Sequence, residues 1–248
     1  MISSTTTPVI HVPEFTFDKA KHVYTLDGRP LTGVTTILGV IGKPFLINWA
    51  ANMVAQYIKD HCDVDEEGIY DVSAEQLEKA KTAHTRKKEE AGAAGTAVHE
   101  IIEGIIKNAI DNNNGYLAET SHENKQVNNF LEWANGTNVR FLDSEKRLYS
   151  AKHWYAGTAD IICEIDGQKY IGDIKTSSGI YPEHFIQCAA YAEAAKEMGL
   201  YDNFHGVIIL NCKKNGGFES AQNFDMKGNF DCFLAALTIY RHLNKITK

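Results

Sequence analysis

The feature that most constrains the fold is a tight turn at residues 166–167, where Asp-Gly separates two runs of β-branched and apolar residues. Asp-Gly is a strong signal for a two-residue β-hairpin turn. With that turn, Ile165 faces Gln168 across the hairpin. Counting outward without a bulge brings Asp160 opposite Asp173, roughly 5 Å apart at Cβ. Two like charges so placed destabilise a sheet unless a positive charge lies between them.

Lys175 is the candidate for that positive charge. It lies two residues beyond Asp173 and therefore shares the same face of the strand. Two acids and one lysine that converge on a sheet indicate a hydrolytic site with a divalent metal. The alternative is a pair of turn-flanking acids that form ion pairs with Lys175 or Arg147. A partly buried pair of acids is costly without a cation, which favours the metal site.

Composition limits the class of protein. The 248 residues are 44% hydrophobic, enough for one large domain, or for a core with an elaborated N-terminal part. A net charge of −7 argues against a passive nucleic-acid coat, although a local basic groove remains compatible with it because charges are screened beyond about 10 Å. The five cysteines lack C-x-x-C spacing, so we expect reduced thiols in a cytoplasmic protein. We expect no signal peptide and no membrane segment.

Hydrophobic periodicity predicts helices in the first half of the chain. Residues 45–60 have helical spacing, with a buried stripe that includes Leu46 and Trp49. A capping box at Ser73 predicts the start of a second helix. Further helices are expected at residues 96–110, after an interruption or junction at Gly92 and Gly95, and from a cap at Thr120 to Gly136.

In the second half of the chain, the sequence pattern predicts mainly strands. Strands are predicted at 139–150, 154–165, 168–176, 206–211 and 219–224, and helices at 182–198 and 227–245. This order indicates an α/β fold with a mixed sheet. We expect residues 1–89 to form a mainly helical N-terminal extension that includes a hairpin at the Asp-Gly turn of residues 27–28. Residues 90–248 would form the core.

Two helical segments carry polar residues at regular spacing. Gly95, His99 and Glu103 lie at i, i+4 and i+8, on one helix face. The order His99-Glu100-x-x-Glu103 is similar to a zinc-protease motif, but Glu replaces the second His, which argues against that function. Alone, the pair of His99 and Glu103 is typical of a helix surface.

Three more residues have an ordinary interpretation beside a functional one. Gln187 and Tyr191 are at i, i+4, which is typical of a half-buried polar pair on a helix. Glu145 lies on the strand that precedes the hairpin, where it either faces solvent or joins the site. The combination of all these residues makes the functional interpretation specific.

Together they resemble the RecB-like branch of the PD-(D/E)XK nuclease superfamily, and in general character its bacteriophage-type exonucleases. The resemblance covers about residues 90–198. The matching segments, in the family's order and spacing, are Gly95-x-x-x-His99-x-x-x-Glu103, Gly157-Thr-Ala-Asp160, Asp173-Ile-Lys175-Thr176 and Gln187-x-x-x-Tyr191.

The resemblance implies a restriction-endonuclease-like core and a nuclease that hydrolyses phosphodiester bonds in DNA with Mg²⁺ or Mn²⁺. It implies these metal ligands: His99, Asp160, Asp173 and the carbonyl of Ile174. It implies that Lys175 orients or activates the attacking water, and that Gln187 and Tyr191 support the site and, with Thr176, contact DNA. Glu145 completes the candidate catalytic set of Asp160, Asp173, Lys175, Gln187 and Tyr191.

Some nucleases of this branch hold an iron–sulfur cluster with one upstream and three clustered downstream cysteines. Here Cys212 and Cys232 stand alone, so we expect no iron–sulfur cluster. The sequence also contains no Walker A motif. A helicase activity would have to come from a partner, and candidate partners besides DNA are a helicase, a recombinase or a single-strand-binding protein.

The favoured function is therefore a DNA exonuclease that acts on DNA ends in recombination, repair or genome processing. An endonuclease with the same chemistry is one alternative, and a non-catalytic DNA-binding or assembly subunit on a nuclease fold is the other. The basic cluster Arg86-Lys87-Lys88 and the helix of Trp49 would wall one side of a DNA channel. A solvated surface is the other interpretation of that cluster.

Overall fold

The hairpin that turns at residues 166–167 supplies the two middle strands of the central sheet. In the computed structural model, which describes residues 13–246, Asp166 and Gly167 have φ of 51° and 75°. Positive φ at both positions is what this turn requires. Ile165 pairs with Gln168, and the ladder runs on without a shift to Ile161 and Gly172. The predicted register is confirmed over this length.

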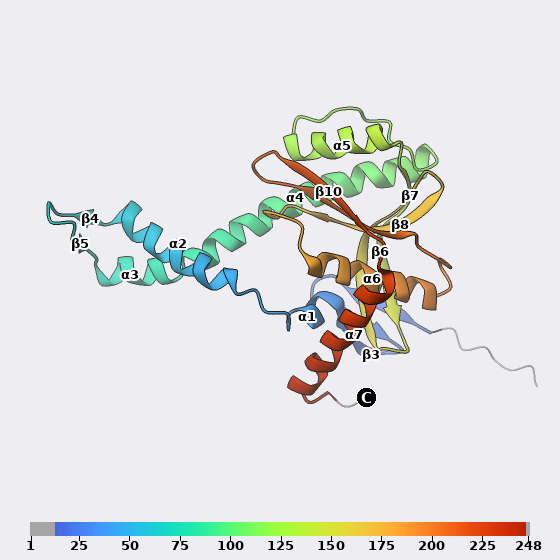
Figure 1. Ribbon diagram of the computed structural model, residues 1–248, viewed down its shortest axis with the longest axis horizontal. Helices are drawn as coiled ribbons and strands as arrows, with labels where there is room; N and C mark the ends of the chain where they lie inside the picture. The colour runs from blue at the N-terminus through green and yellow to red at the C-terminus, as the bar shows by residue number, and fades with distance from the viewer. Residues whose placement is uncertain (1–12, 247–248) are drawn as a thin grey trace, which may run out of the picture.

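Within residues 13–246 the sheet has eight strands of mixed direction, in the order β1-β2-β3-β7-β8-β9-β10, and β6 pairs with the other edge of β7 (Figure 1). Its strands are β1 (Phe15–Asp18), β2 (Val23–Leu26), β3 (Arg29–Gly33), β6 (Arg140–Ser150), β7 (Tyr155–Ile165), β8 (Gln168–Lys175), β9 (Gly206–Cys212) and β10 (Phe218–Asn223). β8 and β9 run parallel, and α6 connects them. The expected α/β class with a mixed sheet is confirmed.

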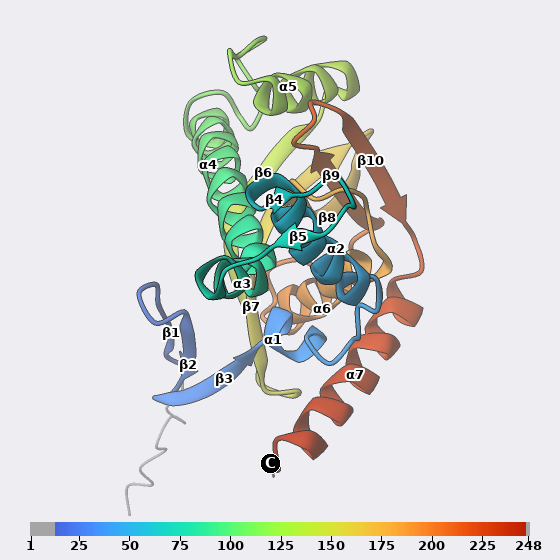
Figure 2. The same ribbon diagram turned by 90° about the vertical axis from the view of Figure 1, so that its left-hand side faces the viewer.

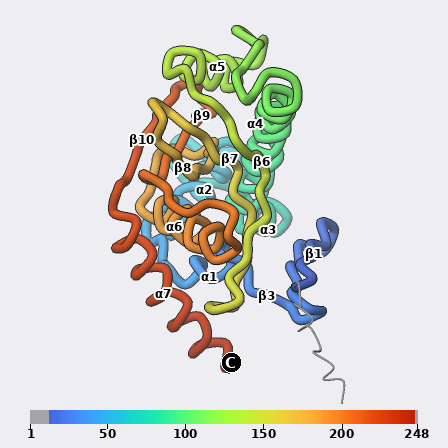
Figure 3. The backbone as a smooth tube through the Cα atoms, turned by 90° about the vertical axis from the view of Figure 1, so that its right-hand side faces the viewer, coloured from blue at the N-terminus to red at the C-terminus, as the bar shows by residue number. Residues whose placement is uncertain are grey.

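Helices cover both faces of this sheet (Figures 1 and 3). One face packs against α1 (Val34–Leu38), α6 (Pro182–Glu197) and α7 (Met226–Leu243). The other packs against α4 (Ala83–Asn112) and α5 (Lys125–Thr137). The alanines of α6, such as Ala189 and Ala190, are fully buried, so the helix lies close to the strands.

The N-terminal segment is part of the sheet. β3 pairs in parallel with the start of β7, through Thr32 with Tyr155 and Gly33 with Ala156. α1 follows directly, and its apolar residues lie in the same core cluster as α6 and α7. The residues assigned to an N-terminal extension therefore contribute one end of the central sheet, and residue 89, where we placed the boundary, lies inside α4.

A helical arm projects from this body (Figures 1 and 2). It contains α2 (Phe45–His61), the two-stranded sheet of β4 (Asp63–Val64) and β5 (Tyr70–Asp71), α3 (Ala74–Lys81) and the first half of α4. α2 packs on α3 and α4 rather than on the core. The expectation of a buried stripe on α2 is therefore wrong: the stripe is half-buried, and Leu46 is exposed.

Two helix boundaries also differ from the sequence prediction. α4 runs unbroken past Gly92 and Gly95, because the helix is held against the sheet beyond them. α5 begins after Asn124, whose side chain accepts hydrogen bonds from the backbone N–H groups of residues 126 and 127, and not at Thr120. The capping box at Ser73 is confirmed. Within residues 13–246, no helix is both long enough and apolar enough to span a bilayer.

Candidate active site

A fork in the sheet positions the candidate site. On one edge of β7, β3 pairs with Tyr155 and Ala156, and β8 pairs with residues 161–165. Residues 157–160 lie between these pairings and pair with neither strand on this edge of β7. We call this point, where β3 and β8 diverge, the fork. Residues 157–160 are the same Gly-Thr-Ala-Asp segment that the sequence pattern singled out. The divergence of β3 and β8 therefore leaves an open pocket beside Asp160.

The two acids lie together at this fork, as the hairpin register predicts. Asp160 lies one position beyond the Ile161–Gly172 pair, the pair of the β7–β8 ladder farthest from the turn, and its Oδ2 accepts a hydrogen bond from the backbone N–H of Ile174 at 2.8 Å. Burial, and then the charge of Asp173, raise the pKa of Asp160 well above its ordinary value. The Asp173 side chain is only 3% exposed. The two carboxylates thus form a strained pair that a cation would stabilise.

Lys175 supplies part of that positive charge. Its Nζ forms an ion pair with Oδ2 of Asp173. Burial by itself would lower the pKa of Lys175, but the carboxylates of Asp173 and Asp160 outweigh burial and raise the pKa above its ordinary value. Lys175 therefore holds its proton more tightly than an ordinary lysine does.

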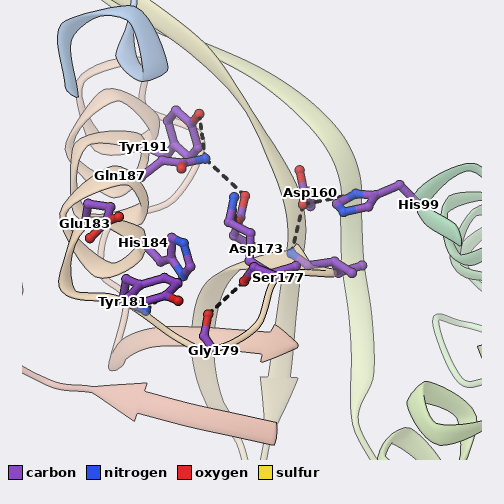
Figure 4. A network of polar contacts seen from close by, with 12 residues as sticks. His99, Asp160, Asp173, Ser177, Gly179, Tyr181, Glu183, His184, Gln187 and Tyr191 are labelled. Carbon is purple, nitrogen blue, oxygen red and sulfur yellow. Dashed lines mark hydrogen bonds and ion pairs between the residues drawn. The ribbon is translucent and has the colours of Figure 1, made fainter. Parts of the chain in front are cut away.

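His99, on α4, approaches Asp160 from the side opposite to α6 (Figure 4). Its Nδ1 lies 3.6 Å from Oδ2 of Asp160, and its side chain is 32% exposed. Burial lowers the pKa of His99, although Asp173 and a hydrogen bond with the backbone of Ile174 oppose this. A neutral imidazole is the form that can ligate a metal.

α6 supports Asp173 through a chain of hydrogen bonds (Figure 4). Gln187 Nε2 donates to Oδ1 of Asp173 at 3.1 Å and lies 3.2 Å from the hydroxyl of Tyr191. Tyr191 in turn packs against Gly157, where an added Cβ would lie 2.3 Å from the ring. The i, i+4 pair therefore orients Asp173 rather than forming an isolated polar contact.

Gly95 has a similar steric role on the other side of the site. A Cβ at this position would lie 2.6 Å from Oγ1 of Thr176, the residue that follows β8. The absence of a side chain lets α4 approach the end of β8, which brings His99 to Asp160. Thr176 is half-buried in this contact.

Glu145 lies on β6 at a local distortion. Its φ is 51°, and it falls between the paired residues Ser144 and Lys146, in register with Asp160. Burial, and then the charge of Glu103, raise the pKa of Glu145. The three acids Glu145, Asp160 and Asp173 therefore occupy adjacent strands.

A pocket of about 340 Å³ opens at these residues. It is lined by His99, the three acids, Lys175, Gln187 and Tyr191, together with residues that the sequence analysis did not assign to the site. These additional residues come from β1, β2, the turn between them, the end of β3 and the start of α1: Phe17, Lys19, His22, Tyr24, Gly33, Val34 and Thr35. Tyr24 hydrogen-bonds Thr158 at 2.8 Å. No motif in the sequence links this hairpin to the site.

The basic cluster Arg86-Lys87-Lys88 lies on the arm and does not line this pocket. The Arg86 guanidinium donates to the carbonyl of Lys79 and lies 5.3 Å from the ring centre of Tyr57. Lys87 pairs with Glu90 at 3.7 Å. Arg86 thus joins the three helices of the arm.

The donors at the fork fit a hard divalent cation in type, since two carboxylates and a backbone carbonyl suit Mg²⁺ and one imidazole suits Mn²⁺. Among the described residues, no group of three or more His, Cys, Asp or Glu side chains is placed to hold a metal ion. The Asp173 carboxylate forms an ion pair with Lys175, and the Asp160 carboxylate accepts a hydrogen bond from the backbone N–H of Ile174. A bound cation would compete with these contacts.

Comparison with known proteins adds little to this geometry. No family model and no curated protein matches the chain. Solved structures do match, and one of them is titled "Crystal structure of SSO0001". It is 14% identical, with a TM-score of 0.33, over 76% of this chain and 85% of that chain. A likeness of this strength supports no statement about function.

Proposed function

We propose that this protein is a Mg²⁺- or Mn²⁺-dependent deoxyribonuclease of the PD-(D/E)XK type, and that it acts as an exonuclease on DNA ends. The observation that carries the proposal is the convergence of Asp160, Asp173 and Lys175 with His99 at one fork of the sheet. An acid pair with one lysine and an imidazole is unusual as a purely structural arrangement, because the buried carboxylates repel each other.

In this proposal Asp160, Asp173, His99 and the Ile174 carbonyl would hold the metal. When bound, the cation would polarise a phosphoryl oxygen and lower the pKa of a bound water. Lys175 donates hydrogen bonds toward the phosphate or the water from its protonated amine. Gln187 keeps Asp173 in place, and Tyr191 supports Gln187.

The surroundings of the pocket favour an end-directed enzyme over one that cuts within a strand. The β1–β2 hairpin, with Phe17 and His22, forms one wall, and the start of α1 forms another. Walls on two sides restrict a continuous duplex more than a strand end. Lys19 at the hairpin turn adds a positive charge suited to a phosphate.

The test uses end-labelled linear DNA and closed circular DNA, each incubated with Mg²⁺ and then Mn²⁺. We expect degradation of the linear DNA only, with loss in EDTA. Lys175→Ala should lower the rate by about 10²–10³-fold, the usual effect of removing one transition-state donor. Lys169→Ala is the matched control, because Lys169 is exposed on the same strand.

Each other outcome has a clear meaning. Cleavage of the circle would assign an endonuclease. Equal rates for wild type, Asp173→Asn and Lys175→Ala would show that the site is elsewhere. DNA binding without cleavage in either metal would favour the non-catalytic subunit.

A further inference from the structure

A second pocket adjoins the candidate site on the far side of Lys175. Its volume is about 470 Å³, and Thr35, Lys175 and Gln187 line both pockets. It lies between the end of α1, the start of α2 and the first turn of α6. A substrate phosphate held at Lys175 therefore has this pocket directly beside it.

The walls of the second pocket are mainly apolar and carry no net charge at the rim. Leu38, Ile41 and Leu46 contribute apolar surface. Lys43 Nζ lies 2.8 Å from Oε1 of Glu183, so the two charges at the rim neutralise each other. A phosphate would find little attraction here beyond Lys175. A flat, uncharged group with polar edges fits better.

His184 provides a polar edge within this pocket. It is 6% exposed, and its Nδ1 accepts a hydrogen bond from the backbone N–H of Tyr181 at 3.3 Å. In a neutral ring that tautomer carries its proton on Nε2. The Nε2–H donor and the Glu183 carboxylate acceptor together suit the edge of a nucleobase.

A row of three aromatic rings leads outward from the pocket. His184 meets the edge of Tyr181 at 5.6 Å between ring centres, and Tyr181 stacks on Phe45 at 5.7 Å with the planes only 13° apart. Figure 4 shows Tyr181 and His184 together at the start of α6. Phe45 is 50% exposed, so part of its ring remains open to solvent. An exposed aromatic face is a stacking platform for bases.

We propose that the second pocket and the aromatic row of His184, Tyr181 and Phe45 form a subsite for unpaired nucleobases of the DNA strand held at Lys175. The inference rests on the proposed nuclease function and names its substrate class: a strand that is single-stranded on this side of the cleaved bond. A base in a duplex has its pairing edge occupied and is stacked between neighbours, so it cannot enter the pocket. An unpaired base can.

The test compares Phe45→Ala with Ile47→Ala. Both residues are exposed on α2, and Ile47 is 73% exposed. Binding of a fluorescein-labelled single-stranded oligonucleotide is measured by anisotropy in EDTA, and KM and kcat are measured in Mg²⁺. We expect Phe45→Ala to weaken binding about 5- to 100-fold, as expected for loss of one base–aromatic stack. Ile47→Ala should change it less than twofold, and Phe45→Trp should retain it.

A scan with abasic nucleotides separates base recognition from phosphate recognition. In the wild type, an abasic nucleotide at one position should weaken binding by a factor similar to Phe45→Ala. In Phe45→Ala, the same abasic position should cause no further loss, because residue and base belong to one interaction.

Several outcomes would overturn the inference. One is that Phe45→Ala and Ile47→Ala change oligonucleotide binding equally although the wild type cleaves DNA. This result would refute the subsite and leave the nuclease proposal intact. A second is additive loss in the abasic scan. A third is equal binding of blunt duplex and single strand with no abasic effect, which would indicate a phosphate subsite. A wild type that neither binds nor cleaves DNA would overturn both proposals.

Discussion

At the scale of single residues, two glycines in the site are required by close packing. Gly157 lies against the ring of Tyr191, and Gly95 lies against Thr176. Neither contact is visible in the sequence, because the partners are 34 and 81 positions away. The sequence pattern nevertheless included both glycines, and the structure supplies their steric reason.

Gly95 and Gly92 make a matched pair on α4. A Cβ at Gly92 would meet nothing within 4 Å. Gly92→Ala should therefore raise the free energy of unfolding by about 0.5–1 kcal/mol through helix propensity. Gly95→Ala should lower it by about 1–3 kcal/mol, because α4 must move from Thr176. Urea denaturation measures both.

The double variant checks the cause of that loss. In a Thr176→Ala background the Oγ1 atom is gone, so Gly95→Ala should become neutral or stabilising. If Gly95→Ala costs the same in both backgrounds, the contact with Thr176 does not explain the glycine.

The raised pKa of Glu145 predicts that the free energy of unfolding depends on pH. Its pKa is raised in the folded protein, chiefly by burial and then by Glu103. Below the unfolded pKa of about 4.3 both states are protonated and the group has no cost. Between this value and the raised folded pKa, the unfolded state loses its proton while the folded state keeps it, so the folded state loses stability as the pH rises, and the loss is complete above the folded pKa. Glu145→Gln should therefore gain stability over wild type from about pH 4.3 upward.

Urea unfolding in EDTA between pH 4 and pH 8 measures this difference. The gain should be smallest at pH 4 and should level off above the folded pKa. A stability difference that is constant across the range would contradict the assignment, since a steric effect of the substitution has no reason to follow pH.

At the scale of elements, local signals were reliable where neighbours in sequence satisfy each other. The Asp-Gly turn set the β7–β8 register, and Ser73 with Gln76 set the start of α3. The apolar stripe of α2 was correctly placed, but its burial was overestimated, because periodicity does not show what the helix packs against. Likewise, Gly92 and Gly95 predicted a break that packing on the sheet prevents.

The arm gives a prediction about DNA binding. Arg86 holds the arm helices together, so a charge-reversal variant that tests DNA binding should keep Arg86 and change only the neighbouring lysines. If the arm contacts DNA, Lys87→Glu with Lys88→Glu should weaken binding and reduce the slope of log K against log salt by about 0.9 for each lost phosphate contact. Lys227→Glu on α7, where the side chain is 86% exposed, is the control.

Fluorescence anisotropy across a series of salt concentrations gives that slope directly. An unchanged slope in the double variant would mean that the arm lysines face solvent in the complex. A slope that falls equally in the Lys227→Glu control would mean that only the net charge matters.

At the scale of the whole molecule, the N-terminal residues complete both the core and the site. Ile37 on α1 is fully buried in the same cluster as α6 and α7. Phe17 and Tyr24 line the candidate active-site pocket. Residues 13–41 therefore belong physically with the sheet, while α2, β4, β5, α3 and the first half of α4 form the arm.

This arrangement predicts the effect of truncating side chains in the two parts. Ile37→Ala should lower the free energy of unfolding by about 2–5 kcal/mol, the usual cost of such a cavity in a core. Ile47→Ala on the arm should change it by less than about 0.5 kcal/mol. Thermal and urea unfolding report both values. Equal, small effects would show that α1 is not part of the folding unit.

The sequence by itself determined the features that depend on residues close together in the chain: the hairpin turn and register, the cap of α3, the order of strands and helices from β6 to α7, and a set of polar residues at regular spacing. Such features follow from backbone conformation and side-chain periodicity over a few positions. The tertiary structure alone decided how the fork opens, how His99 reaches Asp160, and that the N-terminal hairpin walls the pocket. Those depend on contacts such as Tyr24 with Thr158, 134 positions apart, whose formation requires the packed sheet.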